Sequence, residues 1–594
     1  MKKTNFLLGG ALLLVALFTT SCDKLMSKLD NPVSPYLELE QTTANLEYGQ
    51  SITIKPTSIN DQNPIYTYES LNPEIATVDE ATGVVTAVDY DGEATIVAKI
   101  AANEYYQAGQ TEFKVTVSTP AEKTPLSFEA KNDGIITVKF NGGVALAEPI
   151  IATTKGVQTE ITKETEISVT AGQKVRFSSK NASMTNNTAK FVQFATTDTC
   201  FVYGNVMSLI SEDGNFATAT ELTTNATFAG LFKDAINLLN NANCDLVLPA
   251  TTITKQCYYD MFNGCVALTK APALPAEEMK ETCYYQMFYN CQKLEAAPAL
   301  PAKTLAKSCY NAMFKNCKSI VAAPTLSAEN LAENCYYDMF NGCSKLAEAP
   351  ELKAEVMVQS CYYNMFKGCK ALTKAPELPA KTLASNCYRY MFQNCTALIS
   401  VSDLPAETLQ GSCYYGMFQG CTALVKAPEI EATKIASTNS CRQMFYGCTS
   451  LTTPPSTLPG TLSSGGSDFY SMFRNCTSLT TAPILPATTL PGSCYREMFY
   501  GCTSLTATPS LPALKISTRS YQDMFNGCSN LSLVMCNATS GMKTSNNTSN
   551  WLKGVKSTGN FFKNSAAGTA KSGDDVWNTD NDGGIPAGWD VYNL

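Results

Sequence analysis

Histidine is absent from the 594-residue sequence, and charged residues are few. Without histidine, the chain lacks the commonest general base, the commonest metal ligand and every Ser-His or Cys-His nucleophile pair. Catalysis by lysine or carboxylates stays open, but no motif supports it. Charged residues make up 16% of the chain and leave a net charge of −8, so no basic face is available for nucleic acid. We therefore expect no enzyme activity, no cofactor, no metal site and no nucleic-acid partner.

Long apolar runs are equally scarce, and only residues 6–18 (FLLGGALLLVALF) form one. The run follows two lysines, precedes small residues and Cys22, and is too short for a comfortable membrane span. Residues 1–22 resemble a bacterial lipoprotein signal, which implies that Cys22 carries lipid and that the protein is anchored to the outer membrane at the cell surface. The alternative is an ordinary secretory signal cleaved nearby. Residues 23–35 lack periodicity and are expected to be a tether.

Repetition dominates the rest of the chain. A nine-residue phrase, CYYDMFNGC in its first copy (257–265), occurs eleven times with its Met-Phe centres 26 to 28 residues apart. A second phrase, ALTKAPALPAEEM in residues 267–279, separates the copies. A period in this range predicts a solenoid of stacked units, which we place at residues 213–540.

The phrase itself predicts how one unit folds. Cysteine, methionine and cysteine at i, i+4 and i+8 would share one face of a short helix or 3₁₀ turn and point inward. Asn263-Gly264 would then end that turn. Two prolines per unit limit the strand to a few residues. The expected fold class is α+β, with one short strand and one helical turn per coil.

These motifs carry a resemblance to a family. Leu-x-x-Ala-Pro-x-Leu-Pro together with Met-Phe-x-Gly-Cys resembles the leucine-rich repeats of BspA-like bacterial surface proteins, with Cys265, Cys291 and Cys317 in the usual asparagine column. The resemblance implies adhesin-like binding of a host protein, another cell or a glycan. The alternative is a structural or accessory subunit of an envelope complex.

Two β-sandwich-like domains are expected before the solenoid. Residues 36–118 alternate apolar and polar positions between turns. Within them, NPEIATVDEATGVVTAVDYDGEATI (72–96) resembles the group-2 bacterial immunoglobulin-like domain, with Tyr68 in place of the family's tryptophan. The resemblance implies a surface spacer. Residues 124–212 again alternate and predict a second small β domain.

The last residues, 541–594, hold all three tryptophans, Trp551, Trp577 and Trp589. We expect a C-terminal cap with these side chains as its core, since large aromatics more often pack than bind. An exposed carbohydrate platform is the alternative. Asp580 echoes part of a calcium loop, but a glutamate is missing at the twelfth position and a plain turn is favoured.

Twenty of the 24 cysteines lie in the repeats. Like positions of successive coils should stack about 4.8 Å apart, so each thiol would meet its counterparts. Reduced, buried thiols are favoured, because buried cysteine packs as a small hydrophobe. Disulfides are the alternative in an exported protein.

Tyrosines form two further columns. The position three before each methionine is nearly always aromatic and is expected to be half-buried. The next position exchanges tyrosine for arginine, asparagine or glutamine, which indicates exposure. We predict a binding ridge there, since tyrosine and arginine are enriched at hot spots; a column that only pads neighbouring coils is the alternative. The ridge comprises Tyr259, Tyr285, Tyr337, Tyr363, Arg389 and Tyr415.

Overall fold

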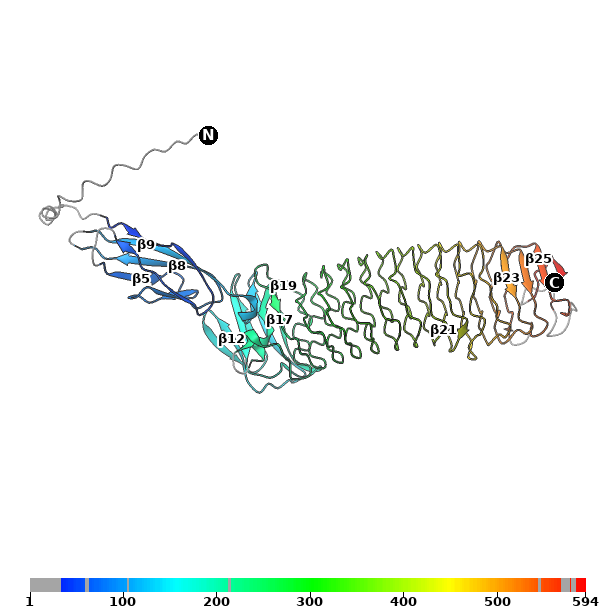
Figure 1. Cartoon of the computed structure of the whole chain (residues 1–594), viewed down its shortest axis with the longest axis horizontal. Helices are drawn as coiled ribbons and strands as arrows, with labels where there is room; N and C mark the ends of the chain where they lie inside the picture. The colour runs from blue at the N-terminus through cyan, green and yellow to red at the C-terminus, as the bar shows by residue number, and fades with distance from the viewer. Residues whose placement is uncertain are drawn as a thin grey trace, which may run out of the picture. The chain divides into compact units, whose positions relative to one another are not determined.

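The computed structural model describes residues 34–58, 64–103, 106–211, 215–542, 546–567, 577 and 584–594. The chain divides into two compact units, Met1–Thr124 and Pro125–Leu594 (Figure 1). Within the described residues the regular elements are strands and short 3₁₀ helices, so the α part of the predicted α+β class is wrong. Cys22, the signal and most of the tether lie outside the described residues.

The first unit is a pair of packed sheets with a small two-stranded edge. One sheet has the order β2-β9-β8-β5 and the other β3-β7-β6, while β1 pairs with β4. Side chains that alternate along these strands, including Phe113, Val115 and Tyr68, form its core. The strands are β1 (Leu37–Glu38), β2 (Thr43–Leu46), β3 (Ser51–Thr53), β4 (Thr57–Ser58), β5 (Tyr66–Ser70), β6 (Ala76–Val78), β7 (Val84–Ala87), β8 (Asp91–Ile100) and β9 (Gly109–Ser118), followed by η2 (Ala121–Lys123).

The second unit begins with two more sheets, ordered β13-β12-β15-β10-β18-β19 and β14-β11-β17-β16. The elements are β10 (Leu126–Ala130), β11 (Gly134–Asn141), β12 (Ile150–Thr154), β13 (Val157–Ile161), β14 (Thr165–Val169), β15 (Lys174–Ser179), β16 (Thr185–Asn187), β17 (Lys190–Thr196), β18 (Cys200–Asn205), η3 (Val206–Leu209), η4 (Phe216–Thr218), β19 (Leu238–Asn240) and β20 (Leu246–Val247).

This β domain covers the first coil of the repeats. Strand β18 pairs in parallel with β19 and β20, which belong to that coil. The Phe194 amide of β17 also donates to the Leu231 carbonyl at 2.8 Å. The rings of Phe128, Phe194 and Phe232 meet across the junction, so the core continues without a break. The sandwich therefore shields apolar surface that an open stack end would expose.

Each coil contains a run of overlapping turns where a helix was expected. Backbone amides alternate between two partners: the Met261 amide donates to the Tyr258 carbonyl in its own coil, and the Phe262 amide donates to Met287 in the next. A helix would direct every amide to its own segment. Half of the amides instead join neighbouring coils, which stack side by side through residues 226–554 (Figure 1).

Every fourth residue of a turn run has a positive φ, as a type II turn requires at its third residue. In the coil that begins at Gln256 these residues are Gln256 (60°), Asp260 (55°) and Gly264 (83°). The third site is glycine or asparagine in every run from residue 256 onward, because these residues tolerate the left-handed region. The Asn-Gly pairs therefore serve this turn rather than the end of a helix. A period of four also places Cys257, Met261 and Cys265 inside.

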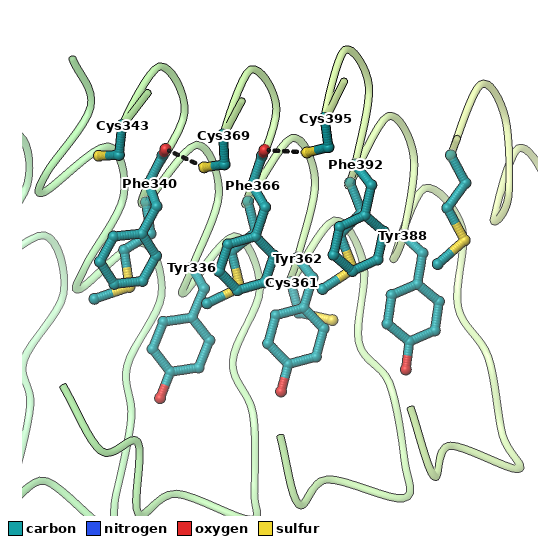
Figure 2. Close-up of a cluster of buried hydrophobic side chains, with 14 of the residues drawn as sticks. Tyr336, Phe340, Cys343, Cys361, Tyr362, Phe366, Cys369, Tyr388, Phe392 and Cys395 are labelled. Atoms are coloured by element: carbon teal, nitrogen blue, oxygen red, sulfur yellow. Dashed lines mark hydrogen bonds between the residues drawn. The ribbon is translucent and has the colours of Figure 1, made fainter. Parts of the chain in front are cut away.

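The coil interior is built from columns of identical side chains. The tyrosine, methionine and phenylalanine of each run lie directly above those of the next (Figure 2). Phe340 and Phe366 stack at 5.8 Å with an interplanar angle of 2°. Tyr336 and Tyr362 stack at 5.7 Å, also at 2°. The tyrosine column that begins at Tyr258 is fully buried, deeper than the half-burial expected from the sequence.

A column of cysteines links the coils through hydrogen bonds. Each thiol donates to the carbonyl oxygen of the phenylalanine in the preceding coil; for example, Cys369 Sγ lies 3.3 Å from the Phe340 oxygen and Cys395 Sγ 3.0 Å from that of Phe366 (Figure 2). The same oxygens also accept the amide of a cysteine in their own coil, so both lone pairs are used. We name this column the thiol ladder. It comprises Cys265, Cys291, Cys317, Cys343, Cys369, Cys395, Cys421, Cys448, Cys476, Cys502 and Cys528.

Strands are short in the repeats, as their prolines predict. Most coils pair through single bridges, such as Lys270 with Ala296 and Leu300 with Leu326. Longer pairing appears at β21 (Thr408–Leu409) with β22 (Lys434–Ile435). A four-stranded parallel sheet then closes the far end. It comprises β23 (Ala507–Leu511), β24 (Leu533–Cys536), β25 (Gly559–Lys563) and β26 (Trp589–Asn593).

The tryptophans pack at this far end. Trp551, Trp577 and Trp589 are all buried, and the Trp551 and Trp577 rings stack at 5.1 Å. Trp551 Nε1 donates to the Gly584 carbonyl at 3.0 Å, and Trp589 Nε1 to Lys556 at 2.9 Å. Their rings are therefore not an exposed carbohydrate platform. Coil geometry continues to Gly554, beyond the boundary at residue 540 expected from the sequence.

Gly447 allows a test of the left-handed turn positions. Its φ is 71°, and a Cβ placed there would meet no atom within 4 Å, so a substitution reports on backbone conformation alone. Gly447→Ala should destabilise the protein by about 1 kcal/mol, and Gly447→Asn by less. Chemical denaturation of both variants would measure this order. Equal stability of the alanine and glycine forms would contradict the backbone assignment.

The thiol ladder predicts loss of stability in alkali. Burial raises the pKa of Cys343, Cys395, Cys448 and Cys528 to about 12. Unfolded thiols ionise near pH 8.5, so between that pH and 12 only the folded chain keeps these protons. Stability is therefore full below pH 8.5 and should fall above it by ~1.4 kcal/mol per pH unit for each such thiol.

Denaturation midpoints measured from pH 8 upward would give this slope. Cys343→Val removes one ionisable group at similar volume and should make the slope shallower. The same slope in that variant and the wild type would show that the thiols do not carry the effect.

Candidate binding face

The turn runs give the repeats one regular outward side. In the first complete run, Cys257, Tyr258, Met261, Phe262 and Cys265 are buried. The residues between them continue as further columns from coil to coil; Tyr259 and Asn263 are half-buried, whereas Asp260 is buried and pairs with Lys233. We call the three columns that begin at Tyr259, Asp260 and Asn263 the turn face.

The six predicted ridge residues lie together on this face in one column. All six are half-buried, whereas the sequence indicated exposure. Tyr259 stacks on Tyr285 at 4.7 Å with an angle of 6°, and Tyr337 stacks on Tyr363 at 4.6 Å with an angle of 11°. Each ring therefore covers a face of its neighbour, as the padding alternative expected, and still reaches solvent.

Arginines continue the column beyond the tyrosines. Arg389 Cζ lies 5.6 Å from the Tyr363 ring centre and 4.5 Å from that of Tyr415. Arg442 Cζ follows at 5.5 Å from Tyr415 and 4.4 Å from Tyr470. These are cation–π distances, so guanidinium planes and phenol rings alternate along the column.

The stacking determines which atoms a partner can reach. Each stacked tyrosine has one face covered by its ring partner, and Arg389 also lies over Tyr363, so a partner meets mainly ring edges and hydroxyls. Partial burial raises the pKa of Tyr259 and Tyr337 to about 12, with desolvation as the main cause. Both phenols are therefore protonated at neutral pH and can donate a hydrogen bond. The column offers a line of hydroxyl and guanidinium donors rather than flat aromatic platforms.

The neighbouring columns add aromatic residues that the sequence reading missed. The Tyr390 ring lies 5.0 Å from that of Tyr415, edge to face. Arg474 Cζ lies 4.1 Å over Tyr500 and 6.0 Å from Tyr446. A signal existed, since Tyr446 and Tyr500 directly follow a Met-Phe pair. The helical interpretation hid it, because a 3.6-residue period does not place these positions beside the ridge.

Ion pairs span neighbouring coils in the earlier part of the turn face. Lys233 Nζ lies 2.7 Å from Asp260 Oδ2, and Lys315 Nζ lies 2.7 Å from Asp338 Oδ2. Arg474 pairs with Glu497 in a later coil. These residues are half-buried or better, so the pairs also fix the surface shape.

Other surfaces are less organised. Lys270, near the bridges, pairs with Asp245 at 2.7 Å on a fully exposed edge. Val321 and Ile399 are exposed apolar residues on that side. A shallow pocket of 330 Å³ lies beside Ile484 and is lined mainly by prolines. None of these surfaces repeats one chemistry from coil to coil.

The part of the chain that the structure describes lacks both a metal-ligand cluster and a membrane-spanning helix. It holds no cluster of three or more acidic, cysteine or histidine side chains fit for a metal ion. It also has no helix with the length and apolar character to cross a bilayer. Asp580, Asp582 and Gly583 of the calcium-like segment lie outside the described residues.

Comparison with known families now places the repeats. The family described as BspA type leucine rich repeat region (6 copies) matches residues 242–346, 307–452 and 441–549, which together span more than half of the chain. The chain therefore belongs to this family, and the predicted leucine-rich-repeat resemblance is confirmed for the repeats. No curated protein matches the sequence.

Proposed function

We propose that this chain is a lipid-anchored surface protein that binds another protein through the turn face of its repeat solenoid. The tyrosine–arginine column, which is interrupted at Asn311, carries the proposal. Both residue types are enriched at binding hot spots. Held in place by neighbouring coils, they lose little conformational entropy when a partner docks.

A protein partner fits this face better than a glycan. Sugars recognised by aromatic side chains lie against open ring faces, whereas Tyr259, Tyr285, Tyr337 and Tyr363 cover one another. Hydroxyls and guanidinium edges instead suit backbone carbonyls and carboxylates of a protein. Repeated weak contacts along the column would add through simultaneous engagement. Binding, rather than catalysis, is the proposed role.

The surface location rests on family and sequence. BspA-like repeat proteins are often surface adhesin-like, and residues 1–22 end in the cysteine that a lipoprotein signal requires. The N-terminal unit, with its two packed sheets, is proposed to be an immunoglobulin-like spacer that carries the solenoid away from the membrane. The bound protein would belong to a host or to another bacterium.

Tyrosine-to-phenylalanine substitutions test the binding face. A variant with phenylalanine at Tyr259, Tyr285, Tyr337 and Tyr363 keeps the stacked rings and loses only the hydroxyls. Partners would be found by screening the full chain against matrix proteins, bacterial cells and glycans. The variant should bind its protein partner about tenfold more weakly, with an unchanged thermal transition, because only edge hydrogen bonds are removed.

Full binding by this variant would place the partner elsewhere, and Tyr→Phe changes in the buried column, at Tyr336 and Tyr362, provide the matched control. Stoichiometric recovery of envelope proteins from intact cells, without host or bacterial partners, would instead favour the accessory-subunit alternative.

Lipid anchoring has a separate test. Cys22→Ala removes the only sulfur that the proposed signal could modify, so the protein should appear in the soluble fraction and cease to partition into detergent. Fractionation of cells that express each form would measure this. Unchanged membrane association of the variant would exclude Cys22 as the anchor.

A further inference from the structure

Charge is distributed unevenly along the turn face. In the earlier coils the lysines of the turn face have carboxylate partners one coil away: Lys233 lies 2.7 Å from Asp260 and Lys315 lies 2.7 Å from Asp338. The turn runs at 360–368, 386–394, 412–420 and 439–447 contain no aspartate or glutamate. They do contain Lys367, Arg389 and Arg442. We call these four runs the cationic stretch.

The three cations have no carboxylate within ion-pair distance anywhere in the described part of the chain. Arg389 instead donates to Asn386 Oδ1 at 3.2 Å, and Arg442 to Asn439 Oδ1 at 3.3 Å. Lys367 Nζ lies 5.7 Å from the Tyr390 ring centre. Carboxylates are in excess in the chain, whose net charge is −8, yet these three cations have no ion-pair partner among the described residues.

The arginines are held in defined positions. Both flank Tyr415, whose ring centre is 4.5 Å from Arg389 Cζ and 5.5 Å from Arg442 Cζ, so the two guanidinium carbons are at most 10.0 Å apart. Stacking fixes the guanidinium planes. Each Nε is buried and each Nη1 already donates to an asparagine, so the outer edge formed by Nη1 and Nη2 keeps N–H groups for a partner. Such an edge matches the two oxygens of a carboxylate.

We infer that the cationic stretch binds an acidic, extended segment of a protein partner. The inference rests on the proposed function, and names the chemistry that the same face recognises. Charge complementarity supplies the occupant: carboxylates of the partner would take the place that Asp260 and Asp338 fill in the earlier coils. The spacing suits carboxylates three residues apart on a polyproline II chain, since one turn of three residues spans ~9 Å and returns the side chain to the same side.

A sulfated glycan is the other polyanion to consider. Its sugar rings would meet ring edges, because the tyrosine faces here are covered by guanidinium groups. Its sulfates would require several unpaired cations in every coil, yet run 412–420 contains none. The sparse, regular spacing therefore favours a peptide over a densely sulfated chain.

Binding of a short oligoglutamate peptide to the full chain tests the inference. An oligoglutamine peptide of equal length controls for charge, and a heparin fragment represents sulfated glycans. The wild type should bind oligoglutamate, more weakly at high salt, and should ignore oligoglutamine. Arg389→Gln with Arg442→Gln should weaken oligoglutamate binding by about tenfold, because two partly exposed ion pairs are lost.

The matched control is Lys255→Gln with Lys307→Gln, which removes two cations that are already paired and should not weaken binding. Arg389→Lys with Arg442→Lys keeps the charges but loses the planar fork, and should weaken binding less than the glutamine variant. This lysine variant decides the question if the glutamine variant does not fold.

Any one of three results would overturn the inference. The paired-lysine control could lose as much oligoglutamate affinity as the Arg→Gln variant, both arginine variants could bind as tightly as the wild type, or the wild type could bind heparin in preference to oligoglutamate. If the tyrosine variant loses protein binding but peptide binding does not depend on the arginines, the proposed function would be supported and this inference overturned. If peptide binding depends on the arginines but the screen finds no protein partner, the anion-binding site would be supported and the proposed function overturned.

Discussion

The alternation of backbone hydrogen bonds between coils is the constraint on which the repeats depend. Every second amide of a turn run, such as that of Phe262, donates to the following coil. This pairing requires a left-handed residue at every fourth position, which in turn fixes which side chains point inward. Columns of tyrosine, methionine, phenylalanine and cysteine follow from it, and so does the outward turn face. At the first coil it is carbonyl oxygens that would lack a donor from a preceding coil, and the sandwich supplies donors there: the Phe194 amide donates to Leu231 and the Met184 amide to Thr227.

Much of the architecture could be read from the sequence, because spacing alone reports stacking. The 26- to 28-residue spacing of the Met-Phe phrase located the coils, and the family match covers most of them. The local backbone was misread, since cysteines at i, i+4 and i+8 satisfy a helix and a four-residue turn period almost equally. The decisive signal was the glycine or asparagine beside each second cysteine, a residue type that turns require and helix interiors disfavour.

The candidate site was only partly accessible from sequence. Exchange of tyrosine for arginine identified the ridge column, but burial of that column depends on how closely neighbouring coils approach. Tyr390 and Tyr446 were missed because their place beside the ridge follows from the turn geometry. Pairing of charges was also hidden, since Lys315 and Asp338 meet only through the register between two coils. The same register shows that Arg389 has no carboxylate partner among the described residues.

The thiol ladder gives the stack freedom to change length. Each thiol donates its hydrogen bond to a backbone oxygen of the coil before it, an acceptor that every coil provides whatever its side chains. If one whole unit were duplicated or lost, every remaining thiol would therefore still have a carbonyl oxygen to donate to. Cysteines joined in disulfide pairs would instead need new partners. A gene that encodes such units can lengthen its product by recombination without an intermediate that fails to fold. The number of coils can then evolve separately from the side chains on the turn face.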